Sequence, residues 1–106
     1  ESDLSIENKK NLSISRDDWF VLSPNQQGWV KLSQVFPKLT TFKKVDIDAC
    51  NLKNYSVQVK GSKDSGKTWS AWVDDLIELG RVNALKLKVS LAAGDKLARI
   101  RNIRVK

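Results

Sequence analysis

The sequence contains no histidine, no methionine and only one cysteine, Cys50. The absence of histidine excludes Ser-His-Asp and Cys-His nucleophile pairs and every metal site built on histidine. A single cysteine cannot form a disulfide within the chain, which favours a protein made without disulfides. No apolar run approaches the ~20 residues that a membrane-spanning helix needs, so we expect no membrane insertion.

Short runs of alternating apolar and polar residues recur along the chain, and this is the pattern of half-buried β-strands. We expect strands at residues 4–14, 19–22, 28–36, 41–50, 55–60, 69–73, 85–91 and 98–105. Pro37 should end the third strand, and a break in the alternation at Arg101–Asn102 predicts a β-bulge. A chain of 106 residues makes one domain. We therefore expect residues 1–106 to form an all-β fold, a single antiparallel β-sandwich that is jelly-roll-like and has about eight strands.

Residues 62–69 read Ser-Lys-Asp-Ser-Gly-Lys-Thr-Trp and follow an alternating run. Gly66 tolerates positive φ, and the Asp64 carboxylate can accept backbone N–H bonds within its own turn. Ser62 and Thr68 flank the turn and can bond across it, while Trp69 should pack beneath it and be largely buried. These residue types predict a self-braced β-hairpin whose main role is structural.

The octet fits the pattern S-x-D-x-G-x-T-W, which is called the Asp box, at all five fixed positions: Ser62, Asp64, Gly66, Thr68 and Trp69. It resembles the repeat of sialidases and of other secreted glycan-processing, glycan-binding and phage proteins. The longer stretch from residue 55 to residue 72 is similar to small β-sandwich modules of phage tail proteins and carbohydrate-active enzymes. A propeller needs at least four blades, so the resemblance implies the hairpin and a virion or extracellular setting, but not the sialidase activity.

The net charge of +7 lies in the last quarter of the chain. If residues 92–95 form a hairpin loop, the flanking strands pair directly, and Lys88 then faces Arg99 while Lys86 faces Arg101 on one surface. Like charges in that position repel. Either Asp46 and Asp48, which should project outward from a neighbouring strand, neutralise the ladder, or water and salt screen it, or the four basic residues bind an anionic partner. That partner would be an acidic protein face, a cell-wall polymer such as teichoic acid or, ranked lowest because no aromatics interleave with the charges, nucleic acid.

The tryptophans offer a second candidate surface. Trp19 and Trp69 have the phase of core residues, whereas Trp29 and Trp72 share faces with polar residues. Trp29 and Trp72 either cover one end of the core or form an exposed platform that stacks on sugar rings. The acidic group Asp74, Asp75 and Glu78 is either a Ca²⁺ site or, as we expect because its spacing matches no known calcium loop, a solvated edge.

These observations predict a protein that is not an enzyme and that has no cofactor, no metal and no catalytic residues. We expect a structural or adhesion module of a phage or prophage virion or of an extracellular bacterial assembly, with a protein or glycan partner. The alternatives are a carbohydrate-binding module that uses exposed tryptophans and an anion-binding module that uses the basic C-terminal hairpin.

Overall fold

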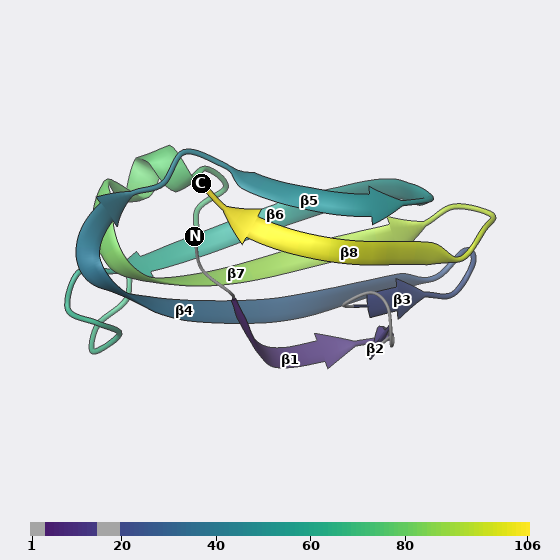
Figure 1. The fold of residues 1–106 in the computed structure, drawn as a ribbon, viewed down its shortest axis with the longest axis horizontal. Helices are drawn as coiled ribbons and strands as arrows, with labels where there is room; N and C mark the ends of the chain where they lie inside the picture. The colour runs from purple at the N-terminus through teal and green to yellow at the C-terminus, as the bar shows by residue number, and fades with distance from the viewer. Residues whose placement is uncertain (1–3, 15–19) are drawn as a thin grey trace.

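The computed structural model describes residues 4–14 and 20–106, and it is built almost entirely of β-strands. Figure 1 shows two layers of strands, with β5 and β8 running above β4 and β7. The elements are β1 (Ser5–Lys10), β2 (Ser13–Ile14), β3 (Phe20–Leu22), β4 (Gln27–Thr41), β5 (Val45–Cys50), β6 (Leu52–Ser62), the short 3₁₀ helix η1 (Leu76–Leu79), β7 (Arg81–Ala93) and β8 (Ala98–Val105). Trp19, which was predicted to be a core residue, lies outside the described residues.

The strands form two antiparallel four-stranded sheets. The first sheet has the order β1-β4-β7-β6, and the second has the order β2-β3-β8-β5. The chain repeatedly passes from one sheet to the other, after β1, β3, β4, β5 and β7. The expected all-β, jelly-roll-like sandwich of about eight antiparallel strands is therefore confirmed.

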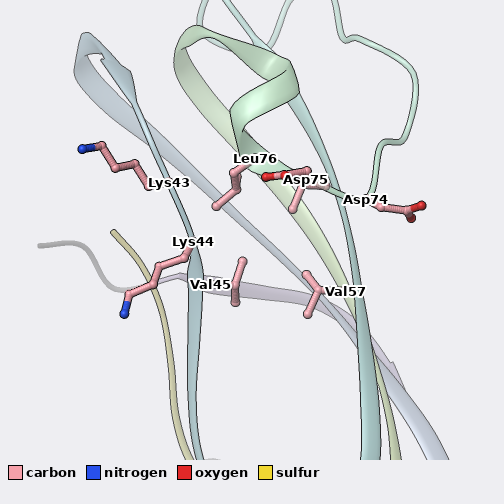
Figure 2. A pocket seen from close by; sticks show the side chains of 8 residues that line it. Lys43, Lys44, Val45, Val57, Asp74, Asp75 and Leu76 are labelled. Carbon is pink, nitrogen blue, oxygen red and sulfur yellow. The ribbon is translucent and has the colours of Figure 1, made fainter.

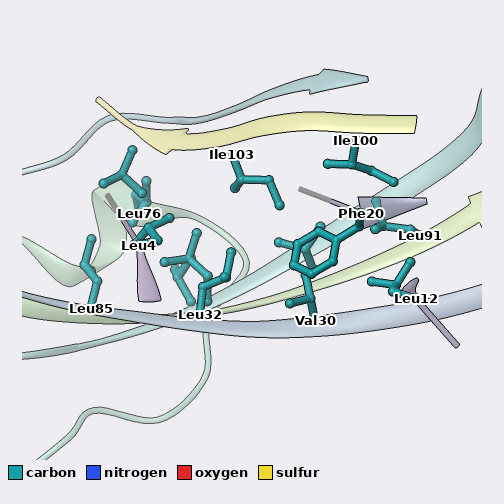
Figure 3. Close-up of a cluster of buried hydrophobic side chains, with 14 of the residues drawn as sticks. Leu4, Leu12, Phe20, Val30, Leu32, Leu76, Leu85, Leu91, Ile100 and Ile103 are labelled. Carbon is teal, nitrogen blue, oxygen red and sulfur yellow. The ribbon is translucent and has the colours of Figure 1, made fainter. Parts of the chain in front are cut away.

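The core lies between the two sheets, where side chains of alternate residues meet. Figure 3 shows Val30 and Leu32 on one side of this space and Ile100 and Ile103 on the other. All four are fully buried, as is Phe20. Burial of this kind contributes roughly 1.5–3 kcal/mol for each large apolar side chain, so the sandwich is held together chiefly by these inward rows.

Pro37 does not end its strand, contrary to the prediction. β4 continues to Thr41, and its pairing with β7 shifts register between Val35 and Thr40. Proline cannot donate a ladder hydrogen bond, but it is tolerated where pairing is interrupted. The irregular stretch between the two paired segments accommodates Pro37 without breaking the strand.

The last two strands do not form a hairpin, and this prediction was wrong. Ala92 and Ala93 belong to β7, which pairs with β4 and β6, whereas β8 pairs with β3 and β5 in the other sheet. Backbone hydrogen bonds hold the crossing, because Gly94 N–H donates to the Asn51 carbonyl at 3.2 Å. Two strands with apolar inner faces can bury them either side by side or across a sandwich, and the alternation is the same in both cases.

The bulge predicted from the broken alternation in β8 is confirmed. Asp48 pairs with Asn102 and Ala49 pairs with Ile100, which leaves Arg101 as the extra residue. The bulge restores the inward phase, because Ile100 and Ile103 are both fully buried although three positions separate them.

We expect Leu32→Ala to lower the free energy of unfolding by roughly 2–5 kcal/mol, because the substitution leaves a cavity between the sheets. The matched control is Val35→Ala on the same strand. Val35 is 56% exposed, so this change should stay within about 0.5 kcal/mol. Chemical denaturation monitored by tryptophan fluorescence measures both variants. Equal losses would contradict the assigned phase of β4.

Candidate functional site

The turn at residues 62–69 is braced by side-chain oxygens, as predicted. The Asp64 carboxylate accepts from Ser62 Oγ at 2.6 Å, from Thr68 Oγ1 at 2.6 Å and from Thr68 N–H at 2.9 Å. Ser62 Oγ in turn accepts from Gly66 N–H at 2.8 Å. A short turn thereby satisfies its backbone donors without a partner strand.

Gly66 is required in this turn for two reasons. Its φ is +95°, which L side chains rarely adopt, and an added Cβ would lie 3.3 Å from the Trp69 ring. Asn83 at the start of β7 anchors the turn, since Ser65 N–H donates to Asn83 Oδ1 at 2.8 Å. Trp69 is half-buried against this loop rather than largely buried as predicted.

The chain after the turn does not form the predicted second strand at residues 69–73. It returns along the free edge of β6 and makes a single bridge, in which Val59 and Val73 exchange backbone hydrogen bonds of 2.8 Å. Ser70 N–H also donates to the Gly61 carbonyl at 2.9 Å. This return segment covers part of an otherwise unpaired strand edge, which protects it from pairing with other chains.

Hydrogen bonds from Ser62, the largest cause, and from Thr68 hold the pKa of Asp64 well below its ordinary value of 3.8. A depressed folded-state pKa gives stability that is present above pH about 4 and is lost as the pH falls from there towards the folded-state pKa.

We therefore expect the melting temperature of Asp64→Asn to lie below that of the wild type at neutral pH. The gap should narrow as the pH falls below about 4. Circular dichroism measures both melting temperatures. If the difference between wild type and variant is as large below pH about 4 as at neutral pH, the carboxylate does not stabilise the turn.

The outer face of the first sheet carries rows of lysine and tryptophan. Directly paired residues share a face, so the register defines three rows. They are Lys10–Trp29–Ser90–Ser56, then Asn8–Lys31–Lys88–Gln58, then Ser5–Ser33–Lys86–Lys60. Trp72 extends the third row, because the Val59–Val73 bridge places it beside Lys60. We call this surface the lysine–tryptophan face.

Two pairs of lysines stand directly opposite one another on this face. Lys31 on β4 is paired with Lys88 on β7, and Lys86 on β7 is paired with Lys60 on β6. Cross-strand Cβ atoms in such pairs are only about 4.5–5.5 Å apart, and like charges there are destabilising. The Glu7 carboxylate, 3.7 Å from Lys86 Nζ, offsets part of this charge.

Each described tryptophan lies beneath a lysine ammonium group. Lys31 Nζ and Lys88 Nζ are each 5.5 Å from the centroid of the Trp29 ring, so one indole holds both members of a like-charged pair. Lys60 Nζ is 4.8 Å from the Trp72 ring, and Lys86 Nζ is 4.8 Å from the Trp69 ring. Such cation–π contacts stabilise by about 0.5–1 kcal/mol at exposed sites, which is enough to direct the ammonium groups.

Trp29 and Trp72 lie on the same face of the sheet, but they are not neighbours. Three strand spacings and four residues of register separate them, which is a distance on the order of 20 Å. Trp29 is half-buried and Trp72 is 36% exposed. The two rings therefore do not form one continuous stacking platform.

The structure divides the four basic residues predicted to share a surface. Lys86 and Lys88 project from the first sheet, whereas Arg99 and Arg101 belong to β8 in the second sheet. The other half of each lysine pair, Lys31 and Lys60, was missed. Each directly follows a buried valine, Val30 or Val59, so the outward phase of both lysines was readable from the sequence, but their cross-strand partners were not.

Asp46 and Asp48 pair with β8 in the second sheet, so they do not neutralise Lys86 and Lys88 as expected. Asp46 is opposite Arg104 and forms a 3.1 Å ion pair with Lys106. The hydrogen bond from Lys106 and its charge lower the pKa of Asp46. Asp48 is opposite Asn102. The second sheet thus balances part of its charge internally.

Two hollows are lined by residues of β5 and β6, one strand from each sheet. One of about 230 Å³ is lined by Val45, Val57 and Leu76, and Figure 2 shows Lys43 and Lys44 pointing away from it on one side and Asp74 on the other. The second, of about 410 Å³, is lined by residues that include Ile47, Ala49 and Tyr55. Both have apolar and polar lining residues, and in the first hollow the charged groups of Lys43, Lys44 and Asp74 do not converge.

Asp75, from the acidic group considered as a calcium site, has a local structural role. It precedes η1, and its carboxylate accepts from Ile77 N–H at 3.1 Å. Within residues 4–14 and 20–106, no group of three or more His, Cys, Asp or Glu side chains is placed to hold a metal ion. No helix in this described part of the chain is long and apolar enough to cross a membrane.

No protein-family model, curated protein or solved structure matches this chain.

Proposed function

We propose that this protein is a non-enzymatic adhesion or structural module that binds an anionic polymer through the lysine–tryptophan face. Its setting would be a phage or prophage virion or an extracellular bacterial assembly. The resemblance of residues 62–69 to the Asp box supports that setting, because the pattern occurs in secreted and phage proteins. The lack of histidine supports a binding rather than a catalytic role.

The observation that carries the proposal is the pair of lysine–lysine contacts across neighbouring strands. Lys31 faces Lys88 and Lys60 faces Lys86, and all four are half-buried on the outer face, where glutamine or serine would avoid the repulsion. An anionic ligand offsets that repulsion and gains favourable energy from a positive potential that the fold has already assembled.

The geometry favours this role over the carbohydrate platform. A sugar ring stacks on a free face of an indole, but lysine ammonium groups lie over the rings of Trp29, Trp69 and Trp72. The tryptophans therefore serve as supports that direct the lysines. A neutral glycan would have to displace a cation–π contact before it could stack.

We expect the double variant Lys31→Gln/Lys88→Gln to elute from heparin-agarose at a clearly lower salt concentration than the wild type, because two phosphate- or sulfate-binding charges are lost. The matched control is Lys43→Gln/Lys44→Gln, which removes the same net charge between β4 and β5, away from the face. The control should elute close to the wild type. Equal shifts in both variants would show that only total charge matters.

The same variant should remain folded. Loss of the cation–π contacts to Trp29 and relief of the lysine–lysine repulsion oppose one another, so the free energy of unfolding should change by less than about 1 kcal/mol. Chemical denaturation at low and high salt measures the free energy of unfolding of the variant and the wild type, and hence the balance of these two effects. A large loss of stability would assign the lysines to the fold instead of to binding.

A further inference from the structure

The arrangement of charge on the lysine–tryptophan face narrows the kind of polymer that it fits. Lys10 lies in the row of Trp29, Lys31 and Lys88 form the next row, and Lys86 and Lys60 form the third. Rows are about 6.7 Å apart along the strands and neighbouring strands about 4.8 Å apart, so the five ammonium groups span on the order of 20 Å diagonally. This spacing suits a chain of repeated charges rather than one compact anion.

The positive charges on this face are all ammonium groups, and the Glu7 carboxylate lies beside one of them, Lys86. The three rows contain no arginine, and the arginines of β8 belong to the other sheet. A guanidinium fork binds carboxylates and phosphates bidentately in a fixed orientation, whereas an ammonium acts as a compact point charge that binds an oxyanion from any direction. A flexible chain of phosphate groups meets this requirement without a fixed orientation.

Lysines cover the tryptophan rings, so stacking of bases or sugars on these rings adds little to the affinity for a ligand. Proteins that bind single-stranded nucleic acid without sequence preference combine positive charge with aromatic rings on which bases stack. Here Lys31 and Lys88 share the Trp29 ring, and Lys60 lies over Trp72. A ligand with bases or sugar rings therefore gains little from the indoles compared with a chain of the same charge that lacks them.

We propose that the ligand is a linear phosphodiester polymer without aromatic bases, lying diagonally across the first sheet from Lys10 on β1 to Lys60 on β6. This inference rests on the proposed function and specifies its ligand. The polymer crosses β1, β4, β7 and β6 in turn, and it passes over both lysine–lysine pairs. Trp29 and Trp72 lie beneath lysines near the two ends of this path.

Glycerol-phosphate oligomers of two, four and eight units, titrated against the whole chain by calorimetry, test the proposed path. Affinity should rise steeply from two units to the length that spans the face. For the eight-unit oligomer, log K should fall with log salt concentration with a slope of about −3.5, as expected for five neutralised phosphates on a single-stranded chain.

Substituting the lysines at the two ends of the path distinguishes a site for a long polymer from a site for only one or two phosphates. Lys10→Gln/Lys60→Gln should weaken binding of the eight-unit oligomer by roughly tenfold or more and reduce its salt slope by about 1.4. Binding of the two-unit oligomer, which Lys31 and Lys88 suffice to hold, should change less than about twofold. Lys43→Gln/Lys44→Gln should affect neither oligomer.

The outcomes that would overturn this inference differ from those that would overturn the proposed function. If no anionic polymer binds, both fail. If two units bind as tightly as eight, or if oligothymidylate with the same number of phosphates binds much more tightly, the diagonal phosphodiester path is wrong while polyanion binding stands. Tighter binding of heparin at equal charge would assign the face to a sulfated glycan instead.

Discussion

The burial of Leu87 and Val89 in β7 is the constraint on which the rest of the first sheet depends. β7 is paired on both sides, and both residues are fully buried. Because side chains alternate strictly along a strand, burial of these two residues sends Lys86 and Lys88 to the outside, and a slip of one residue would place two charges in the core. The positive surface is thus a consequence of how the sandwich closes, and it needs no flexible loop to assemble it.

The sequence predicted which side chains point out of the core better than it predicted which strands lie side by side. The alternation correctly placed Lys86, Lys88 and Asp46 outside the core and located the bulge at Arg101. It could not assign strands to sheets, because β7 and β8 have the same apolar pattern whether they lie side by side or face each other. The like-charge contacts therefore exist, but between Lys88 and Lys31 and between Lys86 and Lys60, which are far apart in the sequence.

The turn at residues 62–69 was predictable where its interactions are local. Asp64, Ser62 and Thr68 bond to one another within seven residues, so residue types and spacing sufficed. The exposure of Trp69 and the path of residues 70–73 were predicted wrongly, because they depend on Lys86 from β7 and on the free edge of β6. Hydrogen bonds between nearby residues specify the turn, whereas contacts with β6 and β7 determine how far Trp69 is exposed and where residues 70–73 run.

The central claim is that the ligand-binding surface lies on the outer face of the first sheet. Nuclear magnetic resonance of lysine ammonium and indole N–H groups during titration with a glycerol-phosphate polymer tests it most directly. We expect the largest shifts at Lys31, Lys88 and the Trp29 indole, with little change at Lys106, which is paired with Asp46 beside the second sheet. Shifts concentrated on the second sheet, or spread evenly over all lysines, would contradict the account.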